Sequence, residues 1–178
     1  MEAFVNRKII FQGKVLRVEH DTVKCENGNL AMREIVRHPG GAAVLCITPE
    51  NEVLLVKQYR YAYQEILFEI PAGKLEDQEK PALTAIREFE EETGNKALDL
   101  TFLNVIYPTC GYSDEKIYLY LVTNFKKTQT HFDEDECIES TYYPLEQVLQ
   151  MVQSGEIKDA KTICALQYYF LLNKREKI

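Results

Sequence analysis

The spacing of apolar positions divides the chain into a strand-rich beginning and a longer part that contains helices. The first forty residues are rich in β-branched and aromatic side chains, and KIIFQGKVLRVEHDTV and LAMREIVRH predict strands on either side of the turn signal Asn27-Gly28. The run HPGG at residues 38–41 then interrupts the pattern. We therefore expect an N-terminal β sub-domain over residues 1–40 and a second domain over residues 41–178.

The second part alternates between short apolar runs and segments with helical spacing. AAVLCIT and VLLVKQY flank the turn PEN and predict a buried hairpin, and TFLNVIY and KIYLYLVTNF predict two further strands. Helices are expected where Pro occupies a first turn, Gly follows a last turn or Asp provides a cap. They are predicted over residues 81–94, over residues 144–155 and from Asp159 onward. This order of elements predicts an α+β fold.

Composition narrows the classes of protein that fit. With 28 acidic and 21 basic residues and a pI near 5.1, the chain lacks the general positive charge of proteins that bind nucleic acid or an anionic membrane surface. No window approaches the roughly 18 apolar residues of a membrane-spanning helix, and the start lacks the apolar core of a secretory signal. The five cysteines form no CxxC pair, which argues against a disulfide framework and a structural zinc site. We therefore expect a cytoplasmic location.

The most unusual segment is REFEEETG at residues 87–94, which places four glutamates in five positions of a predicted helix. They stand near the end of the helix where the dipole disfavours anions. At about 100° per residue, Glu88, Glu91 and Glu92 share one arc. The residues expected on the opposite, buried side are Ala82, Leu83, Ile86 and Phe89.

A carboxylate cluster of this kind favours a bound cation. Its ligands are hard oxygens without His or Cys, which favours Mg²⁺, or alternatively Mn²⁺, together with chemistry on phosphates. The alternative is that the glutamates form a solvated helix face, since glutamate is a good helix former. Glu90 lies near the edge of the apolar face and fits an ordinary solvated or salt-bridged residue.

The helix completes a longer motif that begins at Gly73, GKLEDQEKPALTAIREFEEETGN. The order is glycine, five residues, glutamate, seven residues, then Arg-Glu-apolar-x-Glu-Glu-x-Gly, which resembles the Nudix box. Seven fixed residue types would coincide by chance in on the order of one window in a hundred million. The box residues are Gly73, Glu79, Arg87, Glu88, Phe89, Glu91, Glu92 and Gly94.

The resemblance to Nudix hydrolases extends over nearly the full length and is greatest to the ADP-ribose pyrophosphatase branch. It is carried by RKIIFQGKVLRVEHDTV, MREIVRHPGGAAVL, VLLVKQYRYAYQEILFEIPAGKLE, YPTCGYSDE, FDEDECIE and GEIKDAKTICALQYY. It implies a Nudix α/β/α sandwich preceded by an antiparallel β sub-domain used for homodimer formation. It also implies Mg²⁺-dependent hydrolysis of nucleoside diphosphate sugars, with ADP-ribose cleaved to AMP and ribose 5-phosphate. The alternatives are a hydrolase for another such sugar or a dinucleotide (GDP-mannose, NADH), and a non-catalytic nucleotide-binding domain.

The resemblance also implies roles for individual residues around the metal. The carbonyl of Ala72, Glu88 and Glu92 match metal ligands, Glu91 lies close to them, and Glu79 braces the loop through Arg87. In FDEDECIE, Glu134 is favoured as general base and Glu136 as a further metal ligand, and the two could exchange roles. The predicted catalytic residues are Glu134, Glu136, Glu91 and Arg87.

Substrate contacts are implied for Arg33 and Arg60, because an acidic protein that binds a polyanion needs positive groups locally. The alternative for each is a surface arginine in a strand. Glu115 also matches a recurrent family glutamate, with substrate contact and structural hydrogen bonding as equal alternatives. The proline usual before the glycine of that loop is replaced by Cys110, which bears on the substrate more than on the reaction.

Overall fold

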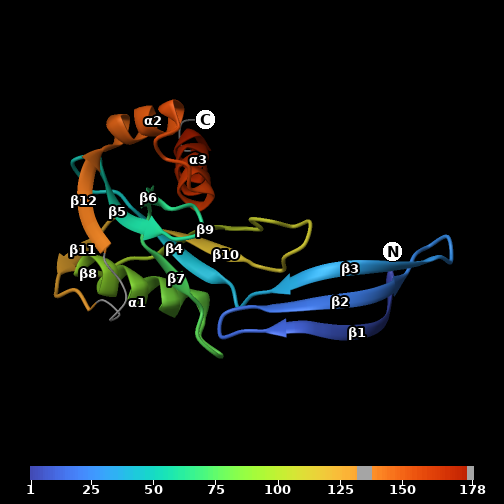
Figure 1. Ribbon diagram of the computed structural model, residues 1–178. Helices are drawn as coiled ribbons and strands as arrows, with labels where there is room; N and C mark the ends of the chain where they lie inside the picture. Colours follow the sequence, from blue (N-terminus) through green and yellow to red (C-terminus); the bar gives the residue numbers. More distant parts are fainter. Residues whose placement is uncertain (132–137, 176–178) are drawn as a thin grey trace. The chain divides into compact units, whose positions relative to one another are not determined.

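The computed structural model describes residues 1–131 and 138–175, with side chains as far as residue 173. Within these residues, twelve strands and three helices form (Figure 1). The chain divides into two compact units, of which the first comprises Met1–Gly40 and Tyr107–Lys116. The second comprises Gly41–Ile106 and Ile117–Ile178. The first unit therefore includes a loop that lies far along the sequence from its strands.

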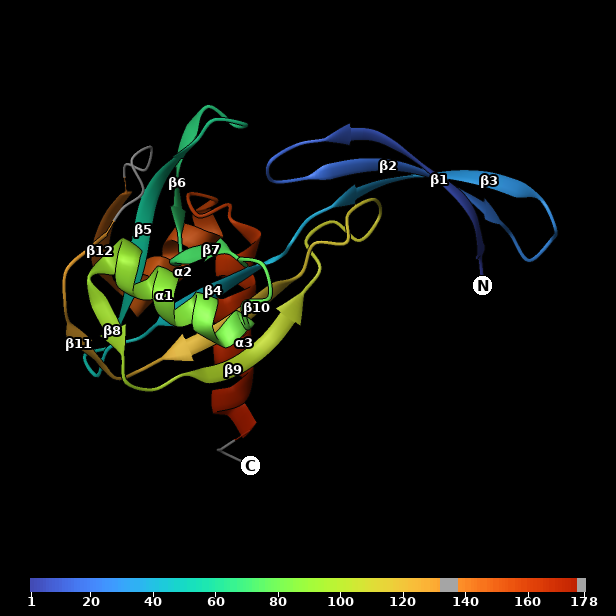
Figure 2. The same cartoon turned by 90° about the horizontal axis from the view of Figure 1, so that it is seen from below.

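The first unit is an antiparallel sheet in the order β1 (Ala3–Gln12), β2 (Arg17–Lys24), β3 (Leu30–Arg37) (Figure 2). The predicted turn at Gly28 is present, with a φ of 86° that glycine adopts without strain. The loop Tyr107–Lys116 is held to β3 because the Val36 N–H donates to the Tyr112 carbonyl at 2.8 Å, and the Asp114 N–H donates to the Val36 carbonyl at 3.2 Å.

The second unit has sheets between two helical layers. One sheet has the order β7-β4-β10-β9, another has the order β12-β5-β6, and β8 pairs with β11. In Figure 1, α1 lies on one side of β4 and β10, whereas α2 and α3 lie on the other. The strands are β4 (Gly41–Cys46), β5 (Glu52–Arg60), β6 (Glu65–Glu69), β7 (Ala72–Lys74), β8 (Asn95–Ala97), β9 (Thr101–Ile106), β10 (Ile117–Val122), β11 (Phe125–Lys127) and β12 (Ile138–Pro144), and the helices are α1 (Pro81–Thr93), α2 (Leu145–Ser154) and α3 (Ala160–Arg175).

Strand β4 shows how the layers are held together, because its residues are buried on both faces. Successive side chains of a strand point to opposite faces. Leu45 packs in one core cluster with Val148 of α2 and Leu166 of α3. Val44 packs in the other cluster with Phe89 of α1. The α+β class and the sandwich that the resemblance implied are therefore confirmed.

The three helices begin near the residues expected, and α1 and α2 also end there. Pro81 occupies the first turn of α1, and Gly94 and Gly155 follow α1 and α2 with φ values of 63° and 78°. The Asp159 carboxylate caps α3 by accepting a hydrogen bond from the Thr162 N–H at 3.0 Å. Among the residues that the structure describes, no helix has the length and apolar character to cross a membrane.

The buried hairpin expected from AAVLCIT and VLLVKQY is wrong. A tight turn does join β4 to β5, with a bridge between Ile47 and Val53 and a hydrogen bond from the Thr48 N–H to the Glu52 carbonyl at 2.9 Å, but the pairing does not continue along the two strands. Strand β4 pairs with β7 and β10, whereas β5 pairs with β6 and β12. Both edges of each strand are occupied, so the two strands enter different sheets.

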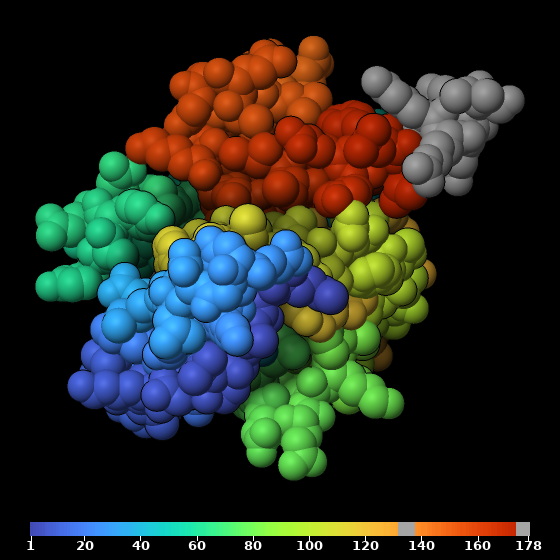
Figure 3. Space-filling view, turned by 90° about the vertical axis from the view of Figure 1, so that its right-hand side faces the viewer, coloured from blue at the N-terminus to red at the C-terminus, as the bar shows by residue number. Residues whose placement is uncertain are grey.

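Strands β5 and β6 form the hairpin that the second unit does contain. Its turn carries two strongly exposed aromatic residues, Tyr61 and Tyr63, which are 82% and 72% exposed. In the space-filling view this turn projects from the surface (teal, Figure 3). In this hairpin, Arg60 at the end of β5 lies opposite Glu65 at the start of β6.

Candidate active site

Helix α1 positions the acidic residues of the box, but its buried side differs from the one expected. Phe89 is fully buried, as predicted, whereas Leu83 is 55% exposed. Glu92 is only 3% exposed and lies on the buried side. A carboxylate tolerates this position because the Ala72 N–H donates to Glu92 Oε2 at 3.1 Å. The acidic face and the buried face therefore overlap at Glu92.

Arg87 is the centre of the exposed part of this cluster. Its Nη2 lies 3.0 Å from Glu79 Oε2, and its Nη1 lies 2.8 Å from Glu88 Oε1 and 3.0 Å from Glu91 Oε2. The expected contact between Arg87 and Glu79 is thus present. The hydrogen bond from Arg87, with a second from the Thr84 hydroxyl, lowers the pKa of Glu79 to about 2. One guanidinium serves three carboxylates, so a net negative charge remains.

Gly73 brings the backbone of β7 against these carboxylates. A Cβ atom at this position would lie 1.8 Å from the carboxyl carbon of Glu88 and 1.9 and 2.3 Å from its oxygens. No side chain fits there without displacing the carboxylate. The glycine that opens the box is therefore required by close approach, and it places the main chain of the loop beside a predicted metal ligand.

The donor chemistry of this region fits a hard divalent cation. In the described part of the chain, no three His, Cys, Asp or Glu side chains gather as a metal site. Mg²⁺ requires fewer protein ligands, because it keeps several waters and binds through one or two carboxylates together with substrate phosphates. Glu88, Glu92 and the main chain of Ala72 supply oxygen atoms of the type that such an ion binds. Glu134 and Glu136 lie in residues 132–137, outside the described residues.

Arg60 is placed beside a buried carboxylate that the sequence did not identify. Its Nε and Nη2 each donate to an oxygen of Glu69 at 2.6 Å. The hydrogen bond to Glu69 raises the pKa of Arg60 against the opposing effect of burial, and the charges of Asp159 and Glu92 add to the increase. The field of Glu92 thus reaches Arg60.

The other predicted substrate residues, Arg33 and Glu115, belong to the first unit. Arg33 lies in β3 and forms an ion pair with Glu2, with Nε at 3.1 Å from Oε2. Glu115 Oε1 lies 3.4 Å from His38 Nδ1. Cys110 is an exposed free thiol in the same loop as Glu115.

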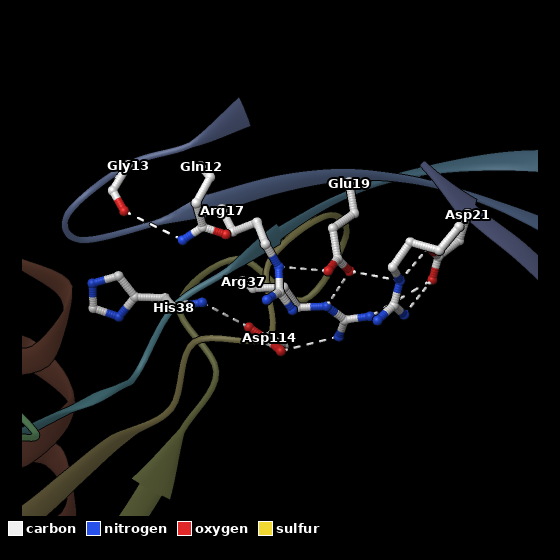
Figure 4. Close-up of polar contacts among 9 residues, drawn as sticks. Gln12, Gly13, Arg17, Glu19, Asp21, Arg37, His38 and Asp114 are labelled. Carbon is white, nitrogen blue, oxygen red and sulfur yellow. Dashed lines mark hydrogen bonds and ion pairs between the residues drawn. The ribbon is translucent and has the colours of Figure 1, made fainter. Parts of the chain in front are cut away.

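The first unit also contains a charged cluster that the sequence did not reveal (Figure 4). Glu19 is fully buried in β2, with Arg37 Nε and Arg17 Nε both 2.7 Å from its oxygens and Arg7 Nε at 3.0 Å. Burial opposes ionisation of Glu19, but the hydrogen bond from Arg37 and the three arginine charges outweigh it and lower its pKa. The same arginines pair with Asp21 and Asp114. The signal in the sequence is weak, because the partners are spread over 108 positions.

A pocket of about 410 Å³ flanks the outer side of α1. It contains Arg87, Glu79 and Glu91, but neither Glu88 nor Glu92 lines it. His131 closes one side, and its N–H donates to the Glu91 carbonyl at 3.0 Å. The remaining lining residues are Leu83, Ile86 and Glu90.

Known proteins with similar sequences and folds match nearly the whole chain. A family model for the NUDIX domain matches residues 37–166. An ADP-ribose pyrophosphatase of Bacillus subtilis (strain 168) is 41% identical over 169 residues, covering 94% of this chain and 91% of that protein. A methanol dehydrogenase activator of Bacillus methanolicus is 40% identical with the same coverage, 94% and 91%. A crystal structure of an ADP compounds hydrolase shares the fold, with a TM-score of 0.85 at 20% identity over 98% of this chain and 95% of that one.

Proposed function

The chain belongs to the NUDIX domain family, and from this premise we propose that it hydrolyses the pyrophosphate bond of nucleoside diphosphate sugars. The preferred substrate in this proposal is ADP-ribose, cleaved to AMP and ribose 5-phosphate. The observation that carries it is the complete set of box residues, with Arg87 bonded to three carboxylates and Glu92 turned toward the loop. The similarity to an ADP-ribose pyrophosphatase over nearly the full length supports the choice of substrate.

Members of this family generally use divalent metal ions, and Mg²⁺ is the ion proposed here, with Mn²⁺ as the second candidate. When bound, the ion would neutralise phosphate charge and lower the pKa of a coordinated water. Glu88, Glu92 and the Ala72 carbonyl would hold it, together with Glu136. Glu88 and Glu92 lie in the negatively charged region around Arg87 and Gly73.

The other roles in the proposed reaction are assigned to side chains of the protein. Arg87 restrains Glu88 and Glu91, so that their carboxylates keep fixed positions before substrate binds. Glu134 is the proposed base that orients the attacking water, and exchange of this role with Glu136 is the alternative. Arg60 and Arg33 are the proposed phosphate or base contacts, since guanidinium binds phosphate in a bidentate manner and stacks on purines. Glu115 completes the proposed substrate contacts.

A homodimer is part of the proposal, and strand β1 supports it. Every residue of β1 is exposed, and the strand lies at an edge of its sheet. Phe4, Ile9 and Phe11 are 61%, 55% and 54% exposed there. Soluble proteins rarely leave such an apolar edge strand uncovered. A second copy of the chain would cover it, and light scattering coupled to size exclusion would give twice the mass of 20.7 kDa.

A cytoplasmic location also belongs to the proposal. The four described cysteines, Cys25, Cys46, Cys110 and Cys164, are free thiols, as a reducing compartment requires. Fractionation of cells that produce the protein, with antibody detection in each fraction, tests this location. Recovery in the soluble cytoplasmic fraction is the expected result.

A substrate panel tests the proposed reaction. Purified protein with Mg²⁺ would be incubated separately with ADP-ribose, GDP-mannose, UDP-glucose, NADH and a nucleoside triphosphate, and the products separated by chromatography. We expect AMP and ribose 5-phosphate from ADP-ribose at the highest kcat/KM. Faster cleavage of another compound would reassign the substrate, and binding of a nucleotide without cleavage of any compound would favour a non-catalytic domain.

A second candidate function is the activation of a methanol dehydrogenase. It is favoured by one observation, the 40% identity to a protein with that name, which nearly equals the identity to the pyrophosphatase. The test is the rate of methanol oxidation by a purified methanol dehydrogenase with and without this protein. A higher rate of methanol oxidation in the presence of this protein in its active form would support this function, and an unchanged rate would rule it out.

A further inference from the structure

The second unit contains a buried charged cluster in which Arg60 alone has one of the roles proposed above. It lies where the start of α3 meets the end of β6. Glu69 is 2% exposed and Lys161 is 8% exposed. Ions are rarely buried so deeply unless they are paired, because removal of their water costs several kcal/mol. The pairing connects β5, β6 and α3, and it lies directly before the loop that opens the box.

Glu69 is held from both sides. Arg60 approaches from β5 with two hydrogen bonds, and the Lys161 ammonium approaches from α3 with an ion pair to Glu69 Oε2. Lys161 Nζ also lies 3.0 Å from Asp159 Oδ1. Two cations and two carboxylates therefore balance. Lys161 compensates part of the Glu69 charge, which would otherwise act on Arg60 alone.

Thr162 forms a hydrogen bond with Ile70, the residue that follows Glu69 in the same segment. Its Oγ1 accepts a hydrogen bond from the Ile70 N–H at 2.8 Å and donates to Asp159 Oδ2 at 2.6 Å. Both Ile70 and Thr162 are fully buried. The Thr162 hydroxyl thus connects the cap of α3 to the backbone of the segment, and no water can replace it without a cavity.

The segment from Glu69 to Ala72 has a tertiary contact at every residue. The Pro71 carbonyl accepts a hydrogen bond from the Val44 N–H at 2.9 Å, and the Ala72 N–H donates to Glu92. Gly73 follows directly against Glu88. The main chain that the start of α3 restrains is therefore the main chain that faces both predicted metal ligands on α1.

We propose that Lys161 and Thr162 are positioning residues for the pyrophosphatase site. Thr162 acts through Ile70 on the loop that faces Glu88 and Glu92, and Lys161 acts through Glu69 on Arg60. This inference rests on the proposed function for its kinetic part, whereas its metal-binding part does not depend on which substrate is cleaved. Mutation of a residue that orients metal ligands without binding the metal itself typically lowers metal affinity or activity by about 10- to 100-fold.

The first test measures metal binding without substrate. Calorimetric titration with Mn²⁺ is expected to show a dissociation constant raised by roughly tenfold or more in Thr162→Val, which keeps the shape and loses the hydroxyl. Thr162→Ser retains the hydroxyl and is expected to bind Mn²⁺ like the wild type. Equal affinity in the wild type and Thr162→Val would overturn the role of Thr162. Weaker Mn²⁺ binding in Thr162→Val, together with wild-type binding in Thr162→Ser, would support that role.

The second test separates KM from kcat with ADP-ribose. Lys161→Met leaves an uncompensated carboxylate beside Arg60, so we expect KM to rise roughly tenfold while kcat changes less than about twofold. Lys161→Arg keeps the charge and should recover most of the affinity. Lys158→Met is the matched control, because Lys158, just before α3, pairs with Glu65 of β6 at 2.7 Å on the exposed surface. An unchanged KM in Lys161→Met, or an equal rise in Lys158→Met, would contradict the proposal.

Folding and function must be distinguished in both tests. If Lys161→Met does not fold, the double variant Glu69→Gln/Lys161→Met removes both charges together, which buried pairs tolerate better than the loss of one partner. Its KM should remain raised because the anchor of Arg60 is lost, and a wild-type KM would overturn the role of Lys161. If the wild type binds Mn²⁺ but cleaves no compound of the panel, the proposed function fails. The role of Thr162 is then still decided by the Mn²⁺ titrations.

Discussion

Two charged clusters, one in each unit, contain the same types of side chain but differ in their charge balance. In the first unit, Arg7, Arg17 and Arg37 meet Glu19, Asp21 and Asp114, so cations and carboxylates are equal in number. Around α1, the ion pairs of the described residues join Arg87 to Glu79, Glu88 and Glu91, and Glu92 stands next to Glu91 in the helix. The balanced cluster needs nothing further to be stable. The unbalanced cluster retains negative charge, as expected of a site completed by a cation.

This difference indicates that a ligand site is recognised by an excess of charge of one sign, and not by buried charge as such. Glu19 is more deeply buried than Glu91, yet ion pairs with three arginines compensate its charge within the fold. The cluster of Glu69 and Lys161 in the second unit is balanced like the first. We therefore assign Glu69 and Lys161 to positioning, whereas Arg60 keeps its proposed substrate contact.

The largest expected effect comes from changing the unbalanced cluster. Glu92→Gln should lower kcat at least ~100-fold, because metal and electrostatic stabilisation supply a large part of the catalysis in such sites. Circular dichroism should show that the fold survives. Glu90→Gln is the control on the same helix, since Glu90 lies 3.8 Å from Lys96 and is not one of the predicted metal ligands or catalytic residues. Wild-type activity in Glu92→Gln would remove Glu92 from the metal ligands.

A smaller effect is expected from crowding the same cluster. Gly73→Ala places a methyl group where the Glu88 carboxylate lies, so the carboxylate must move. We expect a loss of metal affinity of roughly 10- to 100-fold, measured by Mn²⁺ titration. Lys74→Ala, at the exposed neighbouring position of β7, provides the control. Unaltered Mn²⁺ affinity in Gly73→Ala would show that the position of Glu88 is unimportant.

The balanced cluster should respond in stability and not in turnover. Glu19→Gln removes a buried charge that three arginines share, and we expect the free energy of unfolding to fall by about 2 kcal/mol. Urea titration followed by circular dichroism measures this change. The kcat of the folded variant should stay within about twofold of the wild type. A large loss of kcat without a loss of stability would reverse the comparison.

Acid should weaken both kinds of cluster through their arginine-bound carboxylates. The pKa of Glu79 and that of Glu69 are each about 2 in the folded protein, below the ordinary value of 4.5. For Glu69, burial raises the pKa, but the hydrogen bond from Arg60 and the charges of Lys161 and Arg60 outweigh it. A lowered pKa in the folded state stabilises above the ordinary value, and that stabilisation is lost as the pH falls.

We therefore expect the free energy of unfolding to decrease between about pH 4.5 and pH 2, and to decrease less steeply in Glu69→Gln. Urea titrations at several pH values across this range give the slope for each protein. Identical slopes in the variant and the wild type would show that Glu69 keeps an ordinary pKa in the folded state.

Much of the candidate site was predictable because its residues stand close together in the sequence. The Nudix box is continuous, and the NUDIX family match confirmed the resemblance. Helical spacing alone placed Arg87 one turn before Glu91, and the two side chains do meet. The same spacing failed for Leu83, which is exposed, and for Glu92, which is buried with a hydrogen bond from the Ala72 N–H, because periodicity does not include such tertiary partners.

Contacts between distant segments could not be predicted in this way. Lys161 and Glu69 are separated by 92 positions, and either could be a surface residue by type and spacing. The hairpin of β4 and β5 was expected from its turn, but strand edges are occupied by partners that lie elsewhere in the chain. Local signals report turns and periodicity, whereas strand pairing depends on which edges remain open.

The family, the positions of the helices and the acidic residues of the box can be predicted from the sequence, because each depends on near neighbours along the chain. The charge balance around each carboxylate requires the folded structure, since the charged partners of Glu19, Glu69 and Arg87 include residues from other segments of the chain. The folded structure also revealed Lys161 and Thr162 behind the loop of the box. Their contacts form only when α3 packs against the end of β6, and burial then makes each unpaired charge or amide costly.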